Sequence, residues 1–141
     1  MKKILIIGQA PPAVKQTIPY DTTMLYDWFE ECGISKEQAQ DLFDFDAVYN
    51  KFPGFSSSGG HKVPSVEQMD SYWPELSQKI LKANNIIVLG NLAREYLEQT
   101  DAWDSRVHNV LYLMHPSKMN YKRYMDVKDS LIKKLKNFIE N

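Results

Sequence analysis

The sequence has a single cysteine, Cys32, among its 141 residues. One cysteine excludes an internal disulfide bond and any metal cluster held by cysteines alone. Because Cys32 has apolar neighbours, we expect a buried structural thiol. The three histidines (His61, His108 and His115) are too scattered for the ligand spacing of a metal site, so we expect no bound metal.

Long apolar runs and an overall positive charge are also missing. The apolar run after Met1 is too short for a signal peptide or a membrane span, so we expect a cytoplasmic protein without membrane contact. The net charge of −1 excludes a chain that is basic overall. Residues 20–46, however, carry eight acids against one lysine, and residues 115–141 carry seven bases against three acids. The basic end fits an anionic partner, and a solvated helix surface explains it about as well.

The length and the 43% hydrophobic content fit one domain spanning residues 1–141. Strands alternate with helices along the chain. We expect strands at 3–7, 46–49, 85–90 and 109–114, and helices at 22–32, 36–43, 65–83, 91–99 and 121–140. This order predicts an α/β fold with a four-stranded parallel sheet and helices on both faces.

Right-handed crossovers place the carboxyl ends of all four strands at one edge, where ligands bind in such sheets. The loops that begin at Gly8, Asn50, Gly90 and His115 should therefore line one cleft. The first loop, "GQAPP" at residues 8–12, lacks the glycine fingerprint of dinucleotide-binding proteins, and the chain has no Walker lysine. Its prolines prevent a helix from starting at once, which makes it a stiff loop suited to a binding site.

Two of these loops resemble the paired motifs of the uracil-DNA glycosylase superfamily. "GQAPP" is similar to the Gly-Gln-Asp-Pro-Tyr and Gly-Glu-Ala-Pro-Gly motifs, and "HPS" at residues 115–117 is similar to the last motif. Tyr20, a "PG" loop at 53–54 and "VLGNLAREYL" at 88–97 follow in the same order, so the resemblance covers nearly the whole chain. It implies hydrolysis of the bond between sugar and uracil, or a related damaged base, flipped out of DNA.

The resemblance also implies roles for single residues. His115 would donate a hydrogen bond to the uracil carbonyl, where negative charge develops. Gly8, Ala10 and Pro11 would present backbone donors without a side chain that obstructs the base, and Tyr20 would stack on the flipped ring. Two of these residues also have a structural explanation: His115 as a local cap, and Tyr20 as a rim or core aromatic.

Asn50, at the end of the second expected strand, can read the edge of a base, because an amide matches a donor–acceptor pair. It suits an Asx turn equally well.

The first loop contains no carboxylate. Ala10 stands where the best-known branch has its water-activating aspartate, and Gln9 stands where another branch has glutamate. Asp21 is the nearest substitute and Asp46 the second, although Asp21 also suits the N-cap of the following helix. Gln9 is uncharged but able to position a water. The four cysteines of the iron–sulfur branch are missing too, so we expect no cofactor.

Contacts to DNA phosphates are expected on both sides of the cleft. The candidates are Ser117, Lys118, Lys122 and Arg123 after the last strand, and His61 and Lys62 in the "SSSGGHK" loop. That loop also fits a disordered connector. The expected partner is uracil-containing DNA, single- or double-stranded, bound by a monomer. Two other hypotheses stay open: a catalytically silent relative that binds nucleic acid or a base, and a small α/β protein that binds a nucleotide or phosphate compound.

Overall fold

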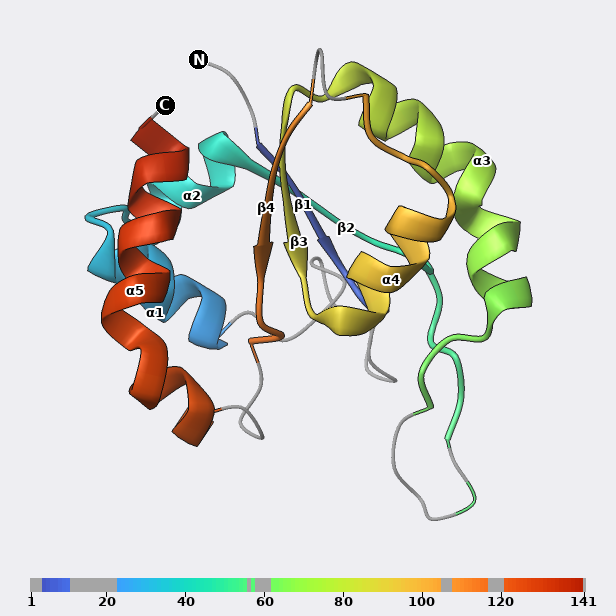
Figure 1. Cartoon of the computed structure of the whole chain (residues 1–141), viewed down its shortest axis with the longest axis horizontal. Coiled ribbons are helices and arrows are strands. Elements are labelled where there is room, and N and C mark those ends of the chain that lie inside the picture. Colours follow the sequence, from blue (N-terminus) through green and yellow to red (C-terminus); the bar gives the residue numbers. More distant parts are fainter. Residues whose placement is uncertain are drawn as a thin grey trace.

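The computed structural model of the chain describes residues 4–10, 23–55, 57, 62–104, 108–116 and 121–140. Within these ranges, strands and helices alternate as expected (Figure 1). The strands are β1 (Ile4–Gly8), β2 (Phe43–Ala47), β3 (Asn85–Leu89) and β4 (Asn109–Leu113). The helices are α1 (Thr23–Glu31), α2 (Lys36–Leu42), α3 (Val66–Lys82), α4 (Asn91–Gln99) and α5 (Tyr121–Glu140).

The sheet has the order β2-β1-β3-β4, and all three strand pairs are parallel. The predicted α/β class and four-stranded parallel sheet are therefore confirmed. All five residues of β1 are buried, because this strand lies between two others and has helices over both faces. The carboxyl ends of the four strands share one edge of the sheet, as parallel pairing requires.

Side chains of each strand alternate between two halves of the core. Ile4 and Ile6 of β1 pack with α1, α2 and α5, whereas Leu5 and Ile7 pack with α3 and α4. Figure 1 shows the two sets of helices on opposite sides of the sheet. No helix among the described residues is both long enough and apolar enough to cross a membrane.

The second strand begins at Phe43, three residues earlier than the predicted strand at 46–49, and α2 ends before it. Phe43 pairs with Ile4 of β1, and its ring stacks on Phe29 of α1 with ring centres 4.3 Å apart. This contact between α1 and the sheet outweighs the local helical pattern, which predicts Phe43 at the end of a helix.

Local signals at the helix ends agree with the structure. Ser35 and Ser65 both form capping boxes, with Gln38 and Gln68, and Gly33 follows α1 with a φ of +79°. Pro74 lies inside α3, which continues through it.

Cys32 is half-buried rather than fully buried, and burial raises the pKa of its thiol. His108 is buried. Its ring forms hydrogen bonds with the Ile80 carbonyl (3.0 Å) and the Asp104 N–H (2.9 Å), so His108 has a structural role.

Candidate functional site

His115 lies two residues beyond β4, packed against the residue that follows β3. That residue is Gly90, whose N–H donates to the Leu113 carbonyl at 2.8 Å and so joins the two strand ends. A Cβ atom added to Gly90 would lie 3.2 Å from the Cβ of His115 and 3.4 Å from its Cδ2. The φ of Gly90 is +86°, which favours glycine as well. Because Gly90 has no side chain, the side chain of His115 can occupy the space next to it.

The imidazole of His115 is partly removed from water. This burial lowers its pKa below the ordinary value for histidine. At neutral pH the ring is consequently neutral, with one nitrogen able to donate a hydrogen bond and the other able to accept one. A neutral donor fixed at the end of a strand suits a substrate oxygen that gains negative charge.

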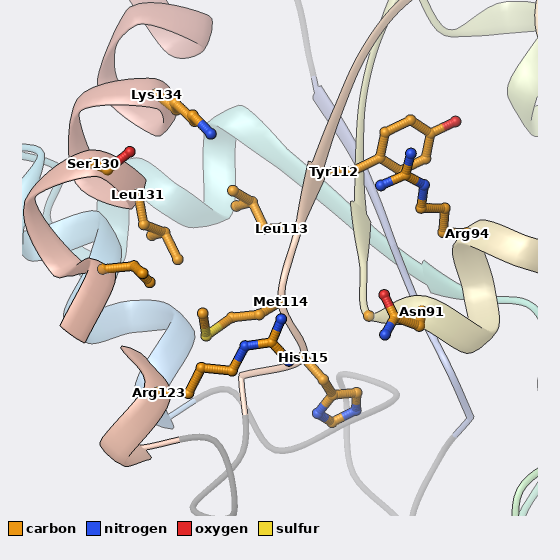
Figure 2. A pocket seen from close by; sticks show the side chains of 12 residues that line it. Asn91, Arg94, Tyr112, Leu113, Met114, His115, Arg123, Ser130, Leu131 and Lys134 are labelled. Atoms are coloured by element: carbon orange, nitrogen blue, oxygen red, sulfur yellow. The ribbon is translucent and has the colours of Figure 1, made fainter. Parts of the chain in front are cut away.

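A cavity of about 480 Å³ opens beside His115, between α4, β4 and α5 (Figure 2). Three of its lining residues are basic: Arg94, Arg123 and Lys134. The other lining residues are Gly90, Asn91, Tyr112, Leu113, Met114, His115, Val127, Ser130 and Leu131. The described lining includes no carboxylate, so the cavity favours an anionic ligand.

Arg94 is held in a defined position. Its guanidinium lies over the ring of Tyr112, 4.4 Å from the ring centre, and its Nε donates to Glu98 at 3.0 Å (Figure 2). The hydroxyl of Tyr112 in turn accepts a hydrogen bond of 2.7 Å from the indole of Trp103. Stacking and hydrogen bonding together orient the remaining guanidinium donors.

The first loop leaves the same edge two strands away from His115. Since neighbouring strands are about 4.8 Å apart, β1 and β4 are separated by about 10 Å, with β3 between them. The carbonyl of Gly8 accepts from the Val48 N–H at 3.0 Å, and Gln9 and Ala10 follow it at this edge. The structure thus brings Gly90 and His115 together, whereas Gly8, Gln9 and Ala10 do not line the cavity beside them.

The remaining predicted residues are spread more widely. Asn50 is exposed after β2, and Lys122 is exposed at the start of α5. Lys62 is also exposed and lines a separate cavity of about 500 Å³ with Pro53 and Ser65. Six predicted site residues lie outside the described residues: Pro11, Tyr20, Asp21, His61, Ser117 and Lys118.

Asp46, the second carboxylate considered for water activation, belongs to the fold instead. It is buried under α3 and accepts hydrogen bonds from Tyr72 (2.9 Å), Lys79 (2.7 Å) and the Ala47 N–H (2.8 Å). Burial alone would lower the pKa of Lys79, but its bonds to Asp46 and Tyr72 outweigh burial and raise it. Burial, followed by the charge of Asp46, raises the pKa of Tyr72. The register explains the placement, because Asp46 pairs with Ile7, whose side chain packs on the α3 side.

The sequence matches the model of the uracil DNA glycosylase superfamily over residues 1–138. The chain belongs to this superfamily. Among solved structures, the fold is similar to that of SMUG2 from Pedobacter heparinus, with a TM-score of 0.63 and 14% sequence identity. The match covers 99% of this chain and 75% of that chain. A search of curated proteins by sequence gave no match.

Members of the uracil DNA glycosylase superfamily are glycosylase hydrolases. Membership agrees with the motifs that singled out the first loop and His115. It says nothing of Arg94 and Lys134, which the sequence did not reveal as site residues. For Lys134 the sequence did contain a signal. The spacing of Arg123, Val127, Ser130 and Lys134 puts all four residues on one face of α5.

Proposed function

We propose that the protein is a DNA glycosylase that hydrolyses the N-glycosidic bond of uracil, or of a related damaged base, flipped out of DNA. The observation that carries this proposal is the placement of His115. It is packed against Gly90 at the carboxyl edge of the sheet, beside a basic cavity, in a chain of the uracil DNA glycosylase superfamily.

In this reaction the bond between base and sugar breaks with its electron pair going to the base. His115 donates its N–H to the base carbonyl on which negative charge accumulates. A fixed donor of this kind typically contributes about 10²–10³ to the rate, because it needs no reorganisation as charge develops. Backbone groups of the first loop, about 10 Å away across β3, face the base from the other side.

Recognition of the base falls to residues of two other loops. We assign Tyr20 to stacking on the flipped ring and Asn50 to hydrogen bonding along its edge. The lowered pKa of His115 supports the same proposal, since the neutral imidazole keeps its donor without placing a full positive charge against an uncharged substrate.

Water adds to the sugar carbon after the base has begun to leave, and the proton that the water loses neutralises the departed base anion. Ala10 and Gln9 provide no carboxylate in the first loop, and Asp46 is engaged by Tyr72 and Lys79. Asp21 is therefore the carboxylate that we propose for orienting the water. Its contribution is smaller than that of His115, because a cation formed on the sugar needs less activation of its nucleophile.

Ala10 and Gln9 also favour a second candidate function, a silent relative that binds DNA or a base without cleaving it. The two functions are separated by incubating the protein with matched single- and double-stranded oligonucleotides containing uracil or thymine at one position. Alkali then breaks the strand at each abasic site. We expect breaks at uracil and none at thymine. Binding of DNA without release of any base would overturn the enzyme and leave the silent relative.

A further inference from the structure

One face of α5 forms a wall of the cavity beside His115. Arg123, Val127, Ser130 and Lys134 follow one another at spacings of four, three and four residues, and all four line the cavity. This spacing produces a single stripe along a helix. At 1.5 Å per residue, the stripe from Arg123 to Lys134 is about 16 Å long, with a cation at each end.

The facing wall is α4, with β4 as the floor between the two helices. Arg94 and Asn91 come from the first turn of α4, and Leu113 and Met114 come from β4 and the residue after it. Figure 2 shows Arg94 on one side of β4 and the α5 stripe on the other. We call this channel the α4–α5 groove. It combines an apolar floor with cations on both walls.

Of the three cations of the groove, Arg94 alone forms an ion pair within the described part of the chain, with Glu98 at 3.0 Å. Lys128, elsewhere on α5, pairs with Glu31 of α1 at 3.0 Å, whereas Arg123 and Lys134 form no ion pair with a described residue. Arg94 keeps its outer guanidinium nitrogens available while its Nε bonds Glu98. The acidic side chains of α1 thus neutralise charge on a different face of α5, and the face that lines the groove keeps its positive charge.

We propose that the α4–α5 groove binds the sugar–phosphate backbone of the nucleic-acid strand that continues from the base at His115. This inference rests on the proposed function for the identity of the strand. Arg94, Arg123 and Lys134 bind phosphate oxygens, and the exposed side chain of Val127 contacts the sugars. Cations spread over about 16 Å match a polyanion, since that length equals the rise of about five base pairs. A single phosphate would require cations that converge on one point.

The test is the salt dependence of binding to a short fluorescein-labelled single strand without uracil, measured by anisotropy. Lys134→Ala and Arg94→Gln should each weaken binding and reduce the log–log salt slope by about 0.7 for each phosphate that the variant no longer neutralises. Lys136→Ala is the matched control. It removes the same charge from the same helix two residues away, on the other side of α5, and should leave the slope unchanged.

Base release is measured separately on uracil-containing DNA. If both groove variants have reduced salt slopes but the wild type releases no base, the groove binds the strand and the proposed function is wrong. Base release with unchanged slopes in both groove variants, or an equal effect of Lys136→Ala, would overturn the groove. Deoxyuridine monophosphate is the competing probe. If it binds with an affinity that depends on Lys134 while the oligonucleotide does not displace it, the groove is a mononucleotide site and the inference is wrong.

Discussion

At the scale of single residues, position 90 determines where the histidine of the last loop lies. Gly90 has a positive φ and leaves its Cβ space to His115, while its N–H bonds the Leu113 carbonyl. Two separate constraints, one on the backbone and one on space, thus apply to one residue. Gly33 is subject only to the first, because nothing lies within 4 Å of a Cβ added there.

This pair of glycines allows the two constraints to be measured separately. Alanine at Gly33 should cost about 1–2 kcal/mol of stability because the residue has a positive φ, and alanine at Gly90 should cost at least as much, because its Cβ would also crowd His115. Only Gly90→Ala should displace His115, and we expect it to slow uracil release by at least about tenfold. Urea denaturation and single-turnover release rates of the two variants provide the comparison. Equal release rates in the two would show that the contact with His115 has no effect on catalysis.

The protonation of His115 gives a second residue-scale prediction. Burial lowers its folded-state pKa, so the unfolded chain binds the proton more readily. Its contribution to the free energy of unfolding is therefore complete above the ordinary pKa of about 6.5 and declines as the pH falls below it. By NMR, the His115 ring should titrate below that value, and His115→Asn should lose less stability on acidification than the wild type. Titration at or above the ordinary value would contradict the burial described for this ring.

At the scale of elements, the sequence predicted three strands and placed the fourth too late. Strands β1 and β3 are apolar runs because both of their faces are buried, and β4 is an apolar run although it is a half-buried edge strand. Strand β2 is an edge strand with Asp44 and Asp46 in it, and its start depends on Phe43 stacking against Phe29. That contact joins residues of separate elements, so no local pattern reveals it.

Asp46 provides the prediction at this scale. Lys79→Met leaves the buried carboxylate of Asp46 with one hydrogen-bond donor fewer. We therefore expect a loss of about 1–3 kcal/mol in the free energy of unfolding. The pKa of Lys79 is raised, so its stabilising effect persists through neutral pH and is lost only in strongly alkaline solution.

Lys82→Met is the control for this change, because Lys82 is exposed in the last turn of the same helix. Urea denaturation at neutral pH compares the two variants. Equal stabilities would mean that Lys79 does not support Asp46. Uracil release should be unchanged in both, since neither lysine lines the cavity beside His115.

At the scale of the whole molecule, the division of charge along the sequence becomes a division in space. Acidic α1 lies beside basic α5, and the Glu31–Lys128 pair joins them. Arg123 and Lys134 of α5 line the groove and form no ion pair with a described residue. The side of α5 on which these two side chains meet the groove could not be predicted from the sequence, because it depends on how α5 packs across β4. The motif order, in contrast, was sufficient to place the first loop and His115 at one edge.

The basic segment after the last strand gives the prediction at this scale. Replacing Lys118, Lys122 and Arg123 with alanine should weaken binding to every DNA sequence alike. The log–log salt slope should fall by about 0.9 for each duplex phosphate that the variant no longer neutralises. Salt titrations of duplex binding measure this effect. The control replaces three exposed lysines elsewhere on the surface: Lys36, Lys82 and Lys136. An unchanged slope in the variant without Lys118, Lys122 and Arg123 would show that these charges contact solvent and not DNA phosphates.

The most direct test of the account compares single-turnover rates of uracil release, at saturating enzyme, for the wild type, His115→Ala and Asp21→Asn. If stabilisation of the departing base dominates, His115→Ala loses about 10²–10³ of the rate and Asp21→Asn loses less. Loss of all release in Asp21→Asn, with most of the rate kept in His115→Ala, would contradict this division of roles.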